Sequence, residues 1–343
     1  MDGKQFAARS EFLFCYDARM CNPNGDPDEN RPRIDHGTGR NLVTEFRLKR
    51  TIRDYLQRMK KPEAVFLRED VANESGALKQ IEDLAKKEID RFVKDNVSIR
   101  EALLKEYIDL RLFGLLFAVE GIEGKAGSKK IPLHFKQTGP VQFAIGQSLH
   151  KVEEIPIKMT RVVPTRGEAR GGAFGDRSIL RYSFIAFHGA LNDHIAEAVH
   201  LLEEDVSDMM NAMWYGTTDL STTSKYGQQS RLLLRTKYNN RHAYIGDLDR
   251  KIKIKTKNEV EIEKLEDLSQ IELEVSDLLD VLRDKKHLLQ AVEYACSNEL
   301  ICRRNDDLGP FSKLIQDWAE KSGISAVNLL DEWQSTGSVS RTP

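Results

Sequence analysis

The stretch that decides the fold runs from Glu11 to Lys61 and reads EFLFCYDARMCNPNGDPDENRPRIDHGTGRNLVTEFRLKRTIRDYLQRMKK. It begins with an apolar run, passes through a loop rich in Asn, Pro, Gly and Asp, and ends in a basic amphipathic helix. Residues 12–16 are apolar at every position, which predicts a central strand buried on both faces. Strand, polar loop and basic helix in this order indicate a polyanion bound where the loop meets the helix.

The aromatic row of this strand, Phe12, Phe14 and Tyr16, has two interpretations. Core packing is the favoured one, because a central strand contributes one such face to the interior. A base-stacking platform, as in RNA-recognition sheets, is the alternative.

The helix after the loop is predicted from a cap and a narrow apolar stripe. Thr44 is placed to cap it. The stripe recurs at intervals of four, three and four residues and consists of Leu48, Ile52, Tyr55 and Met59. The basic residues are then expected to occupy most of the remaining surface, namely Arg47, Lys49, Arg50, Arg53, Arg58 and Lys60. Residues 31–61 hold ten basic and three acidic residues, so positive charge concentrates here.

Composition limits the partners without choosing one. The 343 residues allow one elaborated domain or two small ones, and 52 basic against 54 acidic residues mean that a nucleic-acid site needs clustered charge. Residues 1–11 lack an apolar core, and no run approaches the roughly 20 residues of a membrane span. We expect a cytoplasmic protein with no signal peptide and no membrane partner. The cysteines fit no zinc or redox spacing and are expected to be buried thiols: Cys15, Cys21, Cys296 and Cys302.

Residues 62–138 have the character of an insertion. A helix is predicted from the apolar residues Ile81, Leu84, Ile89, Phe92 and Val93. A capping box of Ser98 and Glu101 predicts a second helix that opens at Ile99. Residues 110–119 are expected to form a buried strand or a helix end, and residues 121–130 a mobile loop.

Two further strands are predicted, at residues 139–149 and 180–191. Between them, residues 160–183 carry five arginines and four glycines, with Phe174 as the only aromatic before Tyr182. We expect a long hairpin that protrudes from the sheet, with a plain surface loop as the alternative.

The remaining elements complete an alternating pattern. Residues 203–215 form an amphipathic helix whose inward stripe, interpreted as core, is Val206, Met209, Met210, Met213 and Trp214. A polar loop and a strand at residues 231–238 follow. Residues 250–257 hold five basic residues and 259–284 ten acidic ones, which indicates a solvated face, with a subunit contact as the alternative. Helices are expected near 285–296 and 311–320, before a disordered tail at 334–343.

In order, the elements are strand, helix, strand, strand, helix and strand. This pattern predicts an α+β fold with a ferredoxin-like or RNA-recognition-motif core and both helices on one face of the sheet.

Enzyme motifs are absent from the sequence: there is no GxSxG elbow, Walker loop, HExxH or dinucleotide fingerprint. The loop carboxylates Asp26, Asp28, Glu29 and Asp35 are interpreted as turn formers, with a divalent-ion site as the alternative. Phosphate binding fits better, since the helix arginines, the loop amides and Lys225, Gln228 and Arg231 supply donors without reading base identity. We expect no cofactor, no metal and no catalytic residue.

Four segments carry a resemblance to a known family: NPNGDPDENRPRIDHGTGRNLVTEFRLKRTIRDYL, TGPVQFAIGQSLHKVEEI, MTRVVPT and the later STTSKYGQQSRLLLR. Over roughly residues 10–240 the chain closely resembles the backbone subunit of type I CRISPR Cascade complexes, the seventh Cas family of the RAMP superfamily. The type I-B branch looks nearest and type I-C next. The C-terminal third resembles the family only loosely.

The resemblance implies a palm, helical fingers and a hairpin thumb. Mapped onto this chain, residues 1–61, 139–151 and 181–240 form the palm, 62–138 the fingers and 152–180 the thumb, with a charged helical extension at 241–333. Positions that match the family's RNA-contacting loop, helix and late loop are Asn22, Asn24, Gly25, Arg47, Lys49, Arg50, Arg53, Ser224, Lys225 and Gln228. Chemistry alone adds Arg161, Arg166, Arg170 and Phe174 in the thumb, and Arg231.

The favoured function is a non-catalytic scaffold that polymerises along guide RNA and leaves bases free to pair with target DNA. The implied partners are guide RNA, target DNA through the guide, further copies of the chain, the large subunit, the fifth-family cap subunit and the guide-processing endonuclease. One alternative is a metal-dependent endoribonuclease that uses Asp26 or Asp17. The other is a ferredoxin-like protein-interaction module without a positively charged groove.

Overall fold

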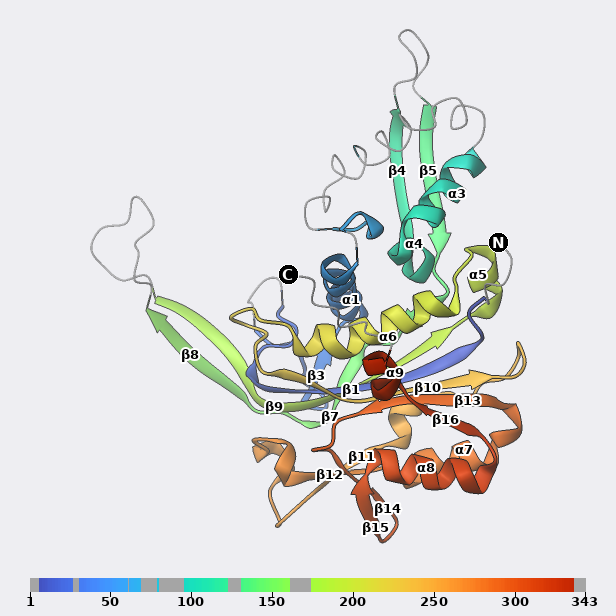
Figure 1. Ribbon diagram of the computed structural model, residues 1–343. Helices are drawn as coiled ribbons and strands as arrows, with labels where there is room; N and C mark the ends of the chain where they lie inside the picture. The colour runs from blue at the N-terminus through green and yellow to red at the C-terminus, as the bar shows by residue number, and fades with distance from the viewer. Residues whose placement is uncertain are drawn as a thin grey trace.

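The computed structural model describes residues 6–26, 31–60, 62–68, 79, 96–122, 131–160 and 174–335. Within these residues the fold is mixed α+β, with strands in three sheets (Figure 1). The helices are α1 (Glu45–Met59), α3 (Asn96–Glu106), α4 (Ile108–Phe113), α5 (Asp193–Ala198), α6 (Glu203–Thr218), α7 (Ser276–Asp284), α8 (Phe311–Ser322) and α9 (Leu329–Ser335). None of the described helices is long and apolar enough to cross a membrane.

The largest sheet runs in the order β16-β13-β10-β1-β9-β7-β3-β2, and β6 and β8 also pair with β9. Its strands are β1 (Ser10–Cys21), β2 (Ile34–Asp35), β3 (Arg40–Val43), β6 (Val141–Phe143), β7 (Gly146–Lys151), β8 (Glu154–Thr160), β9 (Phe174–Leu191), β10 (Gln228–Tyr238), β13 (Leu289–Cys296) and β16 (Ser325–Asn328). β1 pairs antiparallel with both β9 and β10, so it is a central strand as predicted.

One face of this sheet is covered by α1 and α6, which pack against each other (Figure 1). Phe12, Phe14 and Tyr16 are at most 3% exposed and belong to this core. Core packing is therefore confirmed for the aromatic row, and a base-stacking platform is excluded because no base can reach these rings. The two helices approach closely at Gly216, where a Cβ would lie 2.9 Å from the Cβ of Tyr55.

The other face is covered by a C-terminal layer, which we define as α7, α8 and the four-stranded sheet β11-β12-β14-β15 (Figure 1). The strands of this layer are β11 (Lys253–Thr256), β12 (Ile271–Glu274), β14 (Ile301–Arg304) and β15 (Asp307–Pro310). Leu13 and Cys15 of β1 share a core with Leu279 of α7 and Phe311 of α8. The central strands consequently lie between two layers. All four cysteines are buried and free, as predicted.

The basic and acidic residues after residue 250 pair with each other within this chain. Lys255 of β11 pairs with Glu274 of β12 at 2.7 Å, and Lys253 pairs with Asp277 at 2.8 Å. The basic strand and the acidic strand are antiparallel neighbours, so their charges neutralise each other locally.

Several predicted elements differ from the structure. Residues 285–296 were expected as a helix, but residues 289–296 are β13, whose inward residues Val292, Tyr294 and Cys296 recur with period two. Residues 139–149 are divided into β6 and β7. The helix expected at Ile99 begins earlier, at Asn96. Residues 110–119 contain both the end of α4 and the start of β4 (Gly114–Ile122).

Two hairpins stand out from the body of the molecule (Figure 1). β8 pairs with the first part of β9, from Glu154 opposite Leu180 to Thr160 opposite Phe174. This hairpin lies in the region where residues 160–183 were expected to protrude. β4 pairs with β5 (Ile131–Thr138). The helix expected from Ile81 to Val93, most of the loop expected at 121–130 and the tail from residue 336 lie outside the described residues.

Candidate nucleic-acid interface

The end of β1 is joined to the loop that precedes β10. The backbone N–H of Asn22 donates to the carbonyl of Ser224 at 2.9 Å, and Arg19 N–H donates to the carbonyl of Gly227 at 3.0 Å. Gly227 has φ +110°, and a Cβ there would lie 2.4 Å from the carbonyl oxygen of Arg19. Only glycine allows this approach, so it fixes Ser224 and Lys225 beside the end of β1.

Asn24 links the same loop to the start of α1. Its Oδ1 accepts hydrogen bonds from the N–H of Thr44 at 2.8 Å and from the Thr44 hydroxyl at 3.0 Å. Thr44 Oγ1 in turn accepts from the N–H of Arg47, which confirms the predicted cap. Gly25 forms a bridge with Pro32. The role that the structure shows for Asn24 is therefore to position the first turn of α1.

Three basic side chains from separate elements gather at this junction, and we call them the cationic cluster: Arg47 of α1, Arg177 of β9 and Lys225. Lys225 Nζ donates to the carbonyl of Asn22 at 2.7 Å, Arg47 Nη2 donates to Thr51 Oγ1 at 3.0 Å, and Arg177 Nη2 donates to the Thr223 carbonyl. Among the described residues none of the three forms an ion pair with a carboxylate, although the charge of Asp54, which is paired with Arg50, acts on Arg47.

Electrostatics make the cationic cluster a site for an anion. Burial, reinforced by the charges of Arg47 and Arg177, lowers the pKa of Lys225 to about 8. Burial also lowers the pKa of Arg47. A phosphate among these groups would supply the opposite charge that the protein leaves out. Gln228 supports the arrangement, because its Nε2 donates to the carbonyl of Lys225 at 3.0 Å.

Two residues expected on the basic surface of α1 are covered instead. Lys49 is 8% exposed and its Nζ donates to Gln142 Oε1 of β6 at 3.3 Å. Arg53 Nε pairs with Asp109 of α4 at 3.0 Å. The predicted exposure of these two side chains is wrong because α4 of the insertion and Gln142 of β6 lie against this face of α1. Arg50 lies nearer the surface and pairs with Asp54 at 2.6 Å.

The prediction of the apolar stripe of α1 was nearly correct. Leu48, Ile52 and Tyr55 are buried, whereas Met59 is 48% exposed and Leu56 is buried in its place. The buried stripe therefore ends about one helical turn earlier than predicted.

Arg231 is also structural. Its side chain is 9% exposed and pairs with Asp17 at 3.0 Å and with Glu299 at 2.6 Å. Tyr182 donates its hydroxyl to Asp17 at 3.1 Å, and burial raises the pKa of Asp17 despite the neighbouring arginine. These two ion pairs are the role that the structure shows for Arg231, with Glu299 supplied by the turn between β13 and β14, and a contact with RNA stays a prediction.

The four residues proposed for the tip of the hairpin are not placed. Arg161, Arg166 and Arg170 lie outside the described residues, and of Phe174 only the backbone pairing with Thr160 is described. Sequence reasoning missed Arg177, which belongs to the same Arg-rich segment. The available signal was that Arg177 lies only three residues before the strand predicted from residue 180. An arginine so near the sheet stays close to it, whereas one farther out in the hairpin does not.

The loop carboxylates give no metal site among the described residues, where no three His, Cys, Asp or Glu side chains lie close enough to hold an ion. Asp26 pairs with Arg33 at 3.7 Å. Asp28 and Glu29 lie outside the described residues.

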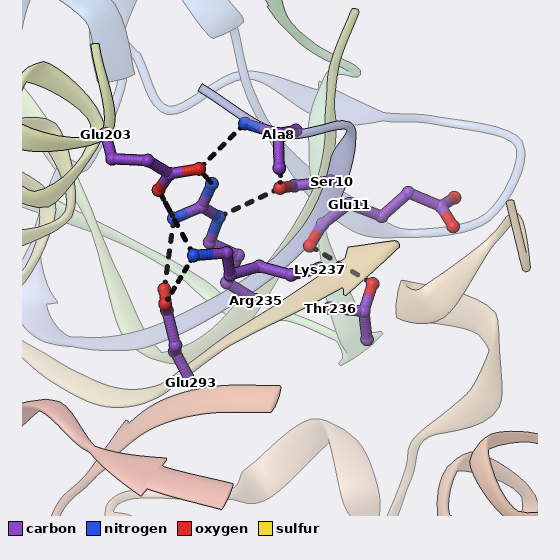
Figure 2. A network of polar contacts seen from close by, with 8 residues as sticks. All are labelled: Ala8, Ser10, Glu11, Glu203, Arg235, Thr236, Lys237 and Glu293. Carbon is purple, nitrogen blue, oxygen red and sulfur yellow. Dashed lines mark hydrogen bonds and ion pairs between the residues drawn. The ribbon is translucent and has the colours of Figure 1, made fainter. Parts of the chain in front are cut away.

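A second group of cations lies at the opposite end of β10, and we call it the Arg235 network (Figure 2). Arg235 is 1% exposed and its Nη1 lies 2.8 Å from Glu203 and 3.1 Å from Glu293. Lys237 reaches the same two carboxylates at 3.4 Å each. Ser10 Oγ accepts from Arg235 Nε at 2.9 Å, so β1, α6, β10 and β13 meet here.

Comparison with known proteins gives consistent matches. The profile of the family described as CRISPR-associated protein Cas7 matches residues 8–276. A relative from Haloferax volcanii, named CRISPR-associated protein Cas7, is 30% identical over 287 residues, which cover 80% of this chain and 82% of the relative.

Two solved structures are similar at 12% sequence identity. A chain of a CRISPR RNA-guided surveillance complex has a TM-score of 0.43, with 86% of this chain and 90% of that chain covered. A chain of such a complex in a pre-nicking state has a TM-score of 0.47, with 92% and 100% covered. On the sequence matches, the chain belongs to the Cas7 family of CRISPR-associated proteins.

Proposed function

We propose that this protein is the guide-RNA-binding backbone subunit of a type I CRISPR interference complex of the Cascade type. The observation that carries the proposal is the cationic cluster, in which Arg47, Arg177 and Lys225 converge without a carboxylate partner among the described residues. Its natural ligand is a phosphate of the RNA backbone.

The proposed mode of binding reads the RNA backbone and not base identity. The donors at the junction are guanidinium, ammonium and amide groups, which suit phosphates and sugars. Both faces of the central strands are covered, so their aromatic residues offer no platform for bases. A subunit of this kind can coat any spacer sequence and leave bases free to pair with target DNA.

In architectural terms, we propose that β10-β1-β9-β7 with α1 and α6 are a ferredoxin-like palm. The strand order and the two helices on one face support this assignment. The β4–β5 hairpin with α3 and α4 would belong to the fingers, and the β8–β9 hairpin to the thumb. Arg161, Arg166, Arg170 and Phe174 remain proposed RNA contacts of that thumb, and type I-B remains the proposed branch.

The proposed partners follow from this role. They are guide RNA, target DNA through the guide, neighbouring copies of this chain, the large subunit, the fifth-family cap subunit and the guide-processing endonuclease, all in the cytoplasm. We propose that the subunit does not itself cleave RNA. The state of Asp17 supports this proposal, because Arg231 and Tyr182 already occupy its carboxylate, and Asp26 faces Arg33.

The test uses the purified full chain and single-stranded RNAs of unrelated sequence and graded length. We expect equal affinity for RNAs of equal length, and particle masses that increase by one protomer at regular increments of length. Fluorescence anisotropy and mass photometry measure the two quantities. Failure to bind RNA, or a strong preference for one sequence, would contradict the proposal.

The nuclease alternative is tested in the same samples. RNA that is cut in the presence of Mg²⁺, with cutting lost in Asp26→Ala, would replace the scaffold proposal. Intact RNA in both the wild type and this variant is the expected result.

A further inference from the structure

Three exposed apolar residues lie next in sequence to the segments that form the cationic cluster. Tyr226 is 75% exposed, Phe46 is 71% exposed and Met20 is 50% exposed. Tyr226 directly follows Lys225, Phe46 directly precedes Arg47, and Met20 lies two residues before Asn22. Single exposed apolar residues are common on proteins, but three beside one uncompensated positive site indicate a binding surface.

Tyr226 is the best placed of the three, because hydrogen bonds hold the backbone at and on both sides of it. Its N–H donates to the carbonyl of Thr222 at 2.9 Å, and the N–H of Lys225 donates to the same carbonyl at 3.0 Å. On its other side, the backbone of Gly227 packs closely against the carbonyl oxygen of Arg19. The ring makes no hydrogen bond or ring contact with any described residue.

We propose that Tyr226 stacks on one base of the RNA whose phosphate is held by Lys225, and so sets the position of that nucleotide on the subunit. The inference rests on the proposed function. A Tyr ring presents a flat apolar face with few rotatable bonds, and stacking on it tolerates any base. This property suits a protein that must hold unrelated sequences in one register.

The stacking is distinct from phosphate binding, and the difference decides the experiment. Removal of a phosphate contact weakens every polyanion, whereas removal of a stacking ring weakens only ligands that carry a base. An RNA and an abasic ribose-phosphate oligomer of the same length therefore separate the two contributions.

The test measures binding of both probes to the full-length wild type, Tyr226→Ala and Tyr226→Phe. For RNA, we expect Tyr226→Ala to lose affinity about tenfold, from the size of base–aromatic stacking. For the abasic oligomer we expect no change, and Tyr226→Phe should behave as wild type. A 2-aminopurine in the RNA should be quenched by wild type and Tyr226→Phe but not by Tyr226→Ala.

Tyr244→Ala is the matched control, because Tyr244 is also an exposed tyrosine, at 63%, but lies far from the cluster. The next residue, Ile245, donates its N–H to Glu11 at the opposite end of β1. This variant should bind both probes as wild type does. An equal loss on both probes in Tyr226→Ala, or no loss on either, would overturn the stacking role. Unchanged affinity with reduced assembly on long RNA would overturn it too and assign Tyr226 to contacts between copies. A wild type that binds neither probe would instead contradict the proposed function.

Discussion

The Arg235 network and the cationic cluster lie at opposite ends of the same central strands. They differ in how their positive charges are balanced. In the network, the buried Arg235 and the partly buried Lys237 face two carboxylates, and every charge has a partner within the protein. In the cluster, three cations rest on carbonyl and hydroxyl oxygens that carry no charge. The network is complete as folded, whereas the cluster is complete only with an anion bound.

This difference shows why a count of basic residues is a poor guide to a nucleic-acid site. The helix α1 contributes Arg47 to the cluster, but its Arg53 is neutralised by Asp109 of α4. Arg231 is occupied in the same way. Whether a cation has a counter-charge, and not merely whether it is present, separates binding residues from structural ones.

The largest expected effect is on stability, from Arg235→Met. This change leaves Lys237 as the one remaining cation beside Glu203 and Glu293 among the residues of the network, so we expect a loss of about 3 kcal/mol in the free energy of unfolding. Urea denaturation measures it. RNA affinity of the folded fraction should be unchanged. Similar stability in wild type and variant would show that the network is not a structural unit.

A smaller loss is expected from Arg53→Met, which tests the division of α1 into two roles. Asp109 is fully buried and keeps its bonds from the N–H groups of Phe66 and Leu67, so we expect a loss of about 2 kcal/mol. Urea denaturation and RNA anisotropy together test the point. Strong loss of RNA affinity at unchanged stability would return Arg53 to the binding surface.

The third effect is a pH dependence of RNA affinity that belongs to the cluster alone. Lys225 has its pKa lowered to about 8, so it loses its proton in the free protein as the pH rises from 7 to 9. Because the charged form binds phosphate, affinity should fall about tenfold over this range. Lys225→Arg stays charged and should abolish the dependence. An identical pH profile in this variant would exclude Lys225 as its source.

The smallest effect is again on stability. Burial disfavours the charge of Lys225, so its folded-state pKa lies below the unfolded value. Its charged form is therefore less favourable in the folded protein at neutral pH, and Lys225→Met should leave stability unchanged or raise it. A thermal melt compares the two proteins. Marked destabilisation would mean that Lys225 is a structural residue like Arg235.

Local patterns predicted the parts of the fold that depend on neighbouring residues in the chain. The strand at residues 12–16, the Thr44 cap and the Met-rich stripe of α6 are all present. Hydrophobic periodicity and capping residues predict these elements from the sequence. The loop of Ser224, Lys225 and Gln228 was also identified and lies at the cluster.

What the sequence could not predict depends on contacts between distant segments. Nothing within α1 signals that α4 covers Lys49 and Arg53, since Asp109 and Gln142 come from remote parts of the chain. Arg231 is neutralised by Glu299 of the C-terminal region in the same way. For β13, the sequence predicted a helix although Val292, Tyr294 and Cys296 alternate, because period two is a weak signal over a short segment.

The most direct measurement compares RNA binding by two variants that lose the same charge. One is Arg47→Gln with Arg177→Gln and Lys225→Gln, and the other replaces three exposed, carboxylate-paired lysines, Lys253, Lys255 and Lys264, with Gln. The cluster variant should lose affinity on the order of 100-fold, with a salt slope shallower by about 2. The control should stay within about threefold of wild type, because its lysines are already neutralised. Equal losses in both variants, or a cluster variant that binds as wild type does, would contradict the account.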